Sequence, residues 1–204
     1  NLMKSPAVNQ AMEILRLLRQ ITESKDEISI KLDKIINMIV EQTGSDAGAC
    51  YIVADDNYLE LFASSGYHSD IAHKISLRVG EGLVGEVAQT NRFLAVADAW
   101  NHPKFSYKTE LGEEAYKSFI GVPLIRWGRA IGVISLQSKE IHDYSSLEVE
   151  ILETVAMVLS EIIASEEMSE YKNTLIKSRG QNEREKFKGL SLSKGYGLGN
   201  AVVH

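Results

Sequence analysis

The segment from residue 80 to residue 85 could bind phosphate, because its glycines follow the pattern Gly-x-Gly-x-x-Gly. In dinucleotide-binding proteins, such glycines let the backbone approach a pyrophosphate at the start of a long helix. Here the preceding residues 74–79 alternate polar and apolar side chains, and the helical stretch Leu83–Thr90 spans only about two turns. Asp98 also follows too soon for a ribose-binding acid, which is expected about 20 residues beyond the motif. A nicotinamide-dependent enzyme is therefore the weakest hypothesis for this chain.

Other residue types that commonly do chemistry are sparse. The single cysteine, Cys50, excludes an internal disulfide and a cysteine-rich metal site, and its place in a strand favours a small buried side chain, with a pocket-facing thiol as the alternative. We expect no catalytic residue, no metal site and no cofactor in this chain. The histidines are too scattered for a metal-binding pattern; they include His68, His73, His102 and His142.

Hydrophobic periodicity predicts the elements that position the glycine segment. Apolar residues recur at three- and four-residue intervals over 8–21 and 28–42, which predicts two amphipathic helices. Two pairs of apolar runs are separated by turn residues, at 55–57 and at Gly128-Arg129, and this spacing favours one antiparallel sheet of five or six strands in an α+β fold. The expected strands are 49–54, 58–64, 75–79, 93–97, 119–127 and 130–138.

A third helix is expected from Ser146 to about Lys177, and it would be about 48 Å long at 1.5 Å per residue. That length exceeds a domain of this size. Its later apolar residues Met168, Tyr171 and Leu175 have the spacing of a coiled-coil seam. We therefore expect a homodimer that pairs through residues 8–21 and 146–177.

Composition sets the broad class. The 204 residues are 44% hydrophobic and 25% charged, which is typical of one globular domain with short appendages. The net charge of −6 gives no attraction to nucleic acid or to an anionic membrane, so neither is an expected partner. Apolar runs fall short of the roughly 20 residues that span a bilayer, and we expect a cytoplasmic protein.

The region around the glycine segment resembles the GAF domain family over about residues 8–168. The resemblance implies an antiparallel sheet with helices on one face, a loop and short helix covering a ligand on the other, and a long C-terminal helix. The residues that carry it are Gly80, Gly82, Gly85 and Val87, then Asp98, then His102, Pro103 and Phe105, and finally 121–124 and 131–137.

The last residues resemble the opening of enzyme I-type phosphoenolpyruvate–protein phosphotransferases, through Gly189, Ser193, Gly195, Gly199 and Ala201. A GAF domain before that opening is the arrangement of the nitrogen-regulatory enzyme I family. This resemblance implies a sensory GAF domain with an extended signalling helix at 1–178, then a charged linker and the truncated start of the next domain at 179–204. Phosphotransfer, its Mg2+ and the phosphocarrier protein partner would belong to domains that this chain does not contain.

The GAF resemblance places a ligand between the sheet and residues 80–118. Free backbone N–H groups at a helix start can hold an anion such as a carboxylate, and aromatic residues are dense in the following loop. Resemblance to nitrogen-regulatory enzyme I implies glutamine or 2-oxoglutarate as the ligand. The expected ligand-binding residues are Leu83, Val84, Asp98, Trp100, Phe105, Tyr116 and Ser118.

The favoured hypothesis is a regulatory domain that senses a small metabolite for a phosphoenolpyruvate–protein phosphotransferase and so controls a nitrogen-related phosphorelay. Two alternatives stay open at this stage. One is a structural dimerisation domain whose pocket is empty and whose aromatic residues only cap the sheet. The other is a cyclic-nucleotide-binding GAF domain, whose characteristic residues cannot be assembled here.

Overall fold

The computed structural model describes residues 5–55, 57–67, 76–104, 116–165, 168–170 and 172–178. The chain divides into two compact units, Asn1–Ser165 and Glu166–His204. In the second unit, the described residues 168–170 and 172–178 are helical. Of the expected dimer seam, Met168 and Leu175 are described, whereas Tyr171 and the whole segment 179–204 lie outside the described residues.

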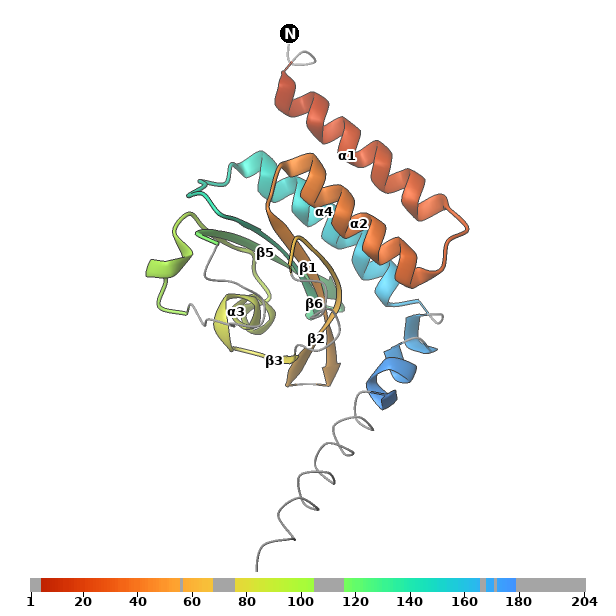
Figure 1. Cartoon of the computed structure of the whole chain (residues 1–204). Helices are drawn as coiled ribbons and strands as arrows, with labels where there is room; N and C mark the ends of the chain where they lie inside the picture. Colours follow the sequence, from red (N-terminus) through yellow and green to blue (C-terminus); the bar gives the residue numbers. More distant parts are fainter. Residues whose placement is uncertain are drawn as a thin grey trace, which may run out of the picture. The chain divides into compact units, whose positions relative to one another are not determined.

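The first unit is built on one six-stranded sheet in the order β3-β2-β1-β6-β5-β4, and all neighbouring strands are antiparallel (Figure 1). This confirms the α+β fold and the antiparallel sheet expected from the hairpin spacing. The strands are β1 Ala47–Asp55, β2 Tyr58–Ser65, β3 Ser76–Arg78, β4 Leu94–Val96, β5 Ser118–Arg126 and β6 Arg129–Ser138.

The turn between β5 and β6 consists of Trp127 and Gly128, one residue earlier than expected. Arg126 pairs with Arg129, and the two residues between them have φ values of 54° and 71°. Two consecutive positive φ values define the type I′ turn, which matches the twist of a hairpin and favours Asn-Gly. Trp127 therefore occupies a backbone conformation that costs a non-glycine residue about 1–3 kcal/mol.

Three helices lie on one side of the sheet (Figure 1). Helix α2, Ile28–Thr43, packs against β1 and β2, and α4, Ser146–Ile163, packs against β5 and β6. Helix α1, Pro6–Glu23, packs on α2 as an outer layer, so its buried stripe is narrow and consists of Ile14 and Leu18. Met12 and Leu15 of the same helix are 61% and 47% exposed.

Helix α4 is shorter than the helix expected from Ser146 to Lys177. It ends at Ile163, and the backbone N–H and the hydroxyl of Ser165 both donate to the carbonyl of Ile162, at 3.2 and 2.6 Å. A serine hydroxyl that bonds a nearby carbonyl offers the backbone an alternative to the helix. The apolar periodicity continues past this point, but the helix does not run through it unbroken.

Helix α3, Gly82–Thr90, packs against β5 and β6 from the opposite side (Figure 1). Because neighbouring strand residues point to opposite faces, Tyr51, Phe119 and Val133 lie with α3 in one core, whereas Leu136 and Ile120 face the other three helices. We call these two sides the α3 face and the helix face. None of the described helices has the length and apolar character needed to span a membrane.

Candidate ligand-binding site

The glycine segment fixes backbone geometry. Gly80 and Gly82 have φ values of 88° and 65°, which glycine adopts most readily. A Cβ atom on Gly85 would lie 2.6 Å from the carbonyl oxygen of Arg78 and 2.9 Å from the backbone nitrogen of Gly80. The Gly80 N–H donates to the Gly85 carbonyl at 2.8 Å, so the turn folds back onto the start of α3. The glycines are therefore explained by close packing and turn geometry.

The predicted residues Leu83 and Val84 belong to the core between α3 and the sheet, where their side chains are 6% and 8% exposed. The residue that precedes α3 is Glu81, whose carboxylate accepts a hydrogen bond from the Arg78 N–H at 2.9 Å. The Glu81 carboxylate therefore already occupies the start of α3. Repulsion between like charges disfavours a second carboxylate there, so the predicted role of the α3 start gains no support from the geometry.

The structure does bring three predicted residues together. The indole N–H of Trp100 donates to the carbonyl of Tyr116 at 2.7 Å, and the N–H of Ala99 donates to the carbonyl of Lys117 at 2.6 Å. Asp98 lies at the start of the same short helical turn and accepts a hydrogen bond from the amide of Asn101 at 2.7 Å. Residues 98–101 are therefore held against the entry into β5.

Beside Tyr116 lie two further polar residues that the sequence analysis did not predict, Tyr67 and Gln137. The Tyr116 hydroxyl, in a residue only 5% exposed, donates to the carbonyl of Gly66 at 3.1 Å. Its ring meets that of Tyr67 edge-on, with centroids 5.6 Å apart, and the Tyr67 hydroxyl donates to the side-chain oxygen of Gln137, which is 5% exposed. We call Tyr67, Trp100, Tyr116 and Gln137 the tyrosine cluster.

Two members of the tyrosine cluster border segments that lie outside the described residues. Tyr67 immediately precedes residues 68–75, and Tyr116 immediately follows residues 105–115. The predicted residue Phe105 falls in the second segment and lies outside the described residues. The only early sign of Gln137 is a polar residue in the apolar strand 130–138, at a position that alternates with Leu136.

Ser118 is not part of this cluster. Its hydroxyl accepts a hydrogen bond from the Tyr144 hydroxyl at 3.3 Å, on the helix face, while its neighbour Phe119 lies in the α3-face core. Burial raises the pKa of Tyr144, so this hydroxyl stays a neutral donor. The predicted site residues are thus divided between the two faces of the sheet, because the sequence argument did not assign each residue of β5 to a face.

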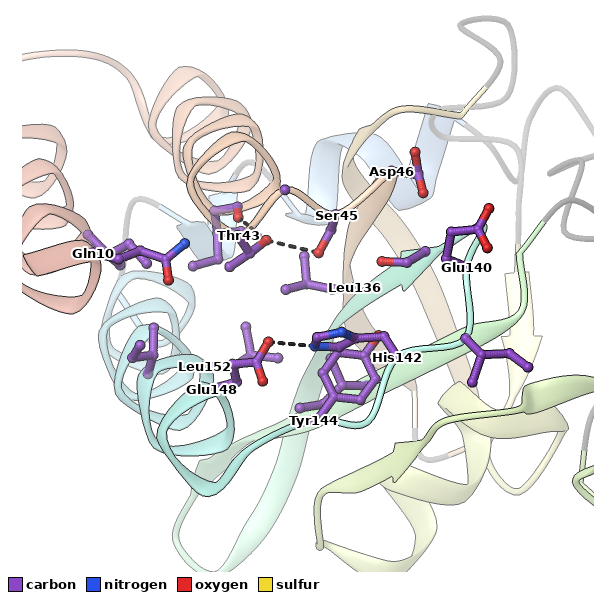
Figure 2. Close-up of a pocket in the computed structure, with 17 residues that line it drawn as sticks. Gln10, Thr43, Ser45, Asp46, Leu136, Glu140, His142, Tyr144, Glu148 and Leu152 are labelled. Atoms are coloured by element: carbon purple, nitrogen blue, oxygen red, sulfur yellow. Dashed lines mark hydrogen bonds and ion pairs between the residues drawn. The ribbon is translucent and has the colours of Figure 1, made fainter. Parts of the chain in front are cut away.

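The helix face contains a cavity of about 220 Å³ (Figure 2). It is bounded by the end of α2, the strands β5 and β6, the loop after β6 and the first turns of α4, with Gln10 of α1 at one side. Its apolar surface comes from seven aliphatic side chains: Ile14, Ile39, Ile120, Leu136, Ile141, Ile151 and Leu152.

Acidic side chains line the polar side of this helix-face cavity, and no lysine or arginine is among its described lining residues. His142 bonds Glu148 at 2.7 Å, as Figure 2 shows. Burial opposes ionisation of Glu148, but its hydrogen bonds to Ser145 and His142 outweigh that effect and hold the pKa of the carboxyl below its usual value. Together with Asp46 and Glu140, this carboxylate makes the cavity unfavourable for an anion.

A family model described as GAF domain matches residues 28–164, which is more than half of the chain. The chain belongs to the GAF domain family. The match spans α2, all six strands, α3 and α4, so it covers both faces of the sheet.

Relatives of this GAF domain include larger regulatory proteins. A protein of Escherichia coli described as "Phosphoenolpyruvate-dependent phosphotransferase system" is 28% identical over 174 residues, covering 81% of this chain and 23% of the relative. A "Nif-specific regulatory protein" of Azospirillum lipoferum is 28% identical over 138 residues, covering 64% of this chain and 22% of the relative. The chain thus spans about a quarter of the length of the curated relatives it matches.

Among solved structures, the GAF domain of a phosphoenolpyruvate–protein phosphotransferase from Coxiella burnetii is 32% identical, with a TM-score of 0.73. The alignment covers 78% of this chain and 95% of that one. The corresponding domain from Acinetobacter is 28% identical, with a TM-score of 0.68. These matches support a regulatory, sensory role for this GAF domain.

Two remaining residues of this GAF domain are structural. Cys50 of β1 is fully buried, and burial raises the pKa of its thiol to about 12, so it is the small buried residue expected from the sequence and a poor nucleophile. His102 accepts a hydrogen bond from the Lys104 N–H at 3.1 Å and so fixes its own loop.

Proposed function

We propose that this GAF domain senses a small polar metabolite for a phosphoenolpyruvate–protein phosphotransferase and binds it at the tyrosine cluster. The observation that carries the proposal is a set of hydrogen bonds that holds the buried Tyr116 and Gln137 beside the partly buried Tyr67 and the half-exposed Trp100. Buried polar groups need partners, and a ligand with matching donors and acceptors could exchange with one of them at little net cost.

The chemistry of the tyrosine cluster favours an uncharged ligand group. Its four members carry hydroxyl, indole and amide groups and no net charge. A carboxamide, which donates and accepts at once, fits such a set, whereas each extra carboxylate would require a cation. We therefore propose glutamine in preference to 2-oxoglutarate. The names of the relatives, which include a nitrogen-fixation regulator, support the link to nitrogen.

The signal would pass through a homodimer to the phosphotransferase and then to a phosphocarrier protein, in the cytoplasm. A ligand shifts such an equilibrium only by its difference in affinity for the two states. A difference of about 1–3 kcal/mol would change the phosphotransfer rate about five- to 150-fold. Mg2+ would serve the phosphotransfer step in the other domains.

Titration calorimetry of the whole chain against glutamine, 2-oxoglutarate and cyclic AMP tests this proposal. We expect heat from glutamine alone, and at least about tenfold weaker binding for Tyr116→Phe, which removes one hydrogen-bonding hydroxyl. Glu140→Gln is the matched control, because Glu140 lines the helix-face cavity and is exposed. No binding of any compound would favour the structural dimerisation domain, and binding of cyclic AMP would favour the second alternative.

Comparing glutamine binding by Tyr116→Phe and Glu140→Gln also locates the ligand-binding site. If Glu140→Gln weakens glutamine binding and Tyr116→Phe does not, the ligand occupies the helix-face cavity and the proposed location is wrong. In the complete phosphotransferase, Trp100→Ala and Tyr116→Ala should abolish the effect of the metabolite on autophosphorylation. A variant that binds no glutamine yet stays fully regulated would contradict the sensing role.

A further inference from the structure

A groove of about 600 Å³ lies at the β5 edge of the sheet. Three elements form it: residues after α3 that include Arg92 and Phe93, the second half of β5, and the outer surface of α4 with Glu153 and Met157. We call it the β5–α4 groove. It is separate from the tyrosine cluster and shares no residue with the helix-face cavity.

Three exposed apolar side chains line the groove. Met157 is 62%, Phe93 46% and Ile125 40% exposed. Single exposed apolar residues are ordinary, but apolar residues that share one groove with charged residues at its border are typical of a protein–protein contact. At the tip of the adjoining hairpin, Trp127 is 90% exposed and holds its unfavourable φ of 54°.

The hairpin tip is held beside the same helix. Arg126 forms an ion pair with Glu161 of α4, four residues after Met157, and its guanidinium lies over the Trp127 ring at 5.9 Å from the centroid. Tryptophan and arginine contribute most often to the central binding energy of interfaces. The exposed apolar residues of the groove and the hairpin therefore form one candidate surface.

A partner strand is an unsuitable occupant. Strand β4 pairs with Phe119–Gly121 and ends there, so among the described residues β5 has no partner on this side beyond Gly121. Pro123 lies in this free stretch and has no backbone N–H to donate to an added strand. The groove is therefore better suited to side chains than to an added strand.

The charged residues of the groove indicate which partner would bind there. Arg92 and Glu153 are both exposed, both line the groove, and neither forms an ion pair within the described part of the chain. An acidic peptide would satisfy Arg92 alone, and a basic peptide Glu153 alone. A second copy of the chain, related by a two-fold axis, would pair with both residues at once. The axis brings Arg92 of each copy opposite Glu153 of the other.

We propose that two copies of this chain pair through the β5–α4 groove, with Arg92 of each protomer facing Glu153 of the other around the apolar contact of Phe93, Ile125 and Met157. This inference rests on the homodimer of the proposed function. It places the contact on the sheet edge of the first unit, in place of the seam of Met168, Tyr171 and Leu175 expected from the sequence.

Charge exchange in the whole chain tests the groove, with mass measured by light scattering over a dilution series. Arg92→Glu and Glu153→Arg should each weaken the dimer at least about tenfold, because each sets like charges against each other twice. The double variant should return the dissociation constant to within a few-fold of the original. Thermal melting should be unchanged, because both side chains are exposed.

Met12→Ser on α1 and Leu175→Ser on the expected seam are the controls, and both should leave the dimer intact. A dimer that these controls weaken, and that the charge variants do not, overturns the groove and leaves the proposed function standing. Failure of the double variant to restore pairing contradicts the Arg92–Glu153 contact. A chain that stays monomeric at every concentration contradicts the homodimer itself.

Discussion

The two faces of the sheet are closed in different ways. On the helix face, α2 and α4 supply 16 and 18 residues, and their inner side chains Ile35, Ile39 and Val155 are completely buried. On the α3 face, α3 is the described helix that packs on the sheet, and it has nine residues. Here the buried set includes Tyr116 and Gln137, whose polar atoms bond groups distant in sequence.

Because of this difference, we expect the apolar contacts of the helix face to determine stability and the hydrogen bonds of the α3 face to determine the response to a ligand. Apolar burial on the helix face contributes free energy without depending on a particular partner geometry. The hydrogen bonds of the α3 face contribute little net free energy, but they require particular partners, and a ligand can supply those. We expect changes in the apolar contacts of the helix face to alter stability, and changes in the hydrogen-bonded residues of the tyrosine cluster to alter binding more than stability.

The largest effect is expected for Ile39→Ala on the helix face. Ile39 is fully buried against the cavity, so its truncation should lower the unfolding free energy by about 2–5 kcal/mol in urea titrations. Glutamine affinity of the folded variant should be unchanged. A lost affinity in a folded Ile39→Ala variant would show that the two faces are not independent.

Gly85→Val tests the close packing of the α3 turn. The new side chain would meet the Arg78 carbonyl, and the unfolding free energy should fall by about 3 kcal/mol. Gly44→Ala is the control, since Gly44 has a φ of 67° but no atom within 4 Å of an added Cβ, so only the cost of its backbone conformation, about 1 kcal/mol, is expected. Equal melting temperatures for the two variants would contradict the packing argument.

Glu148→Gln tests the polar edge of the helix-face cavity. Ser145 and Glu148 form a reciprocal cap at the start of α4. Glutamine can keep the cap hydrogen bond but loses the negative charge at the helix start, so the change should cost up to about 2 kcal/mol at pH 7. Because the folded protein lowers the pKa of Glu148, this stability is present above the unfolded value of about 4.3 and is lost as the pH falls through the folded value.

Denaturation curves measured between pH 7 and pH 3 check this linkage. The original protein should lose more stability than Glu148→Gln over the acid range, while Glu140→Gln should follow the original. A Glu148→Gln variant with the same acid dependence as the original would show that this carboxyl does not carry the effect.

The smallest change in stability, about 1 kcal/mol, is expected for Tyr116→Phe, which removes one hydrogen bond to the Gly66 carbonyl. The loss of glutamine affinity, at least about tenfold or about 1.4 kcal/mol, should be the larger of the two effects. A loss of stability that exceeds the loss of binding would remove the distinction between the two faces.

The fold was predictable because its signals are local. Alternation and turn residues defined the hairpins, and apolar periodicity over 28–42 located α2, which ends at Thr43. The end of α4 was missed because the serine that stops it lies within an apolar pattern that continues.

The tyrosine cluster was only partly predictable. Trp100 and Tyr116 were chosen for their aromatic character, but Tyr67 and Gln137 come together across 70 residues of sequence. Such a contact depends on strand order, which no local pattern contains. Ser118 is close to Tyr116 in sequence, but its hydroxyl bonds Tyr144 on the other side of the strand.

The chain has two tryptophans, and their surroundings differ sharply. Trp127 is almost fully exposed, whereas the indole N–H of Trp100 is bonded to the Tyr116 carbonyl. In a Trp127→Phe protein, all indole fluorescence therefore arises from the edge of the tyrosine cluster. Its emission wavelength and its quenching by iodide would report directly on that site, without any attached dye.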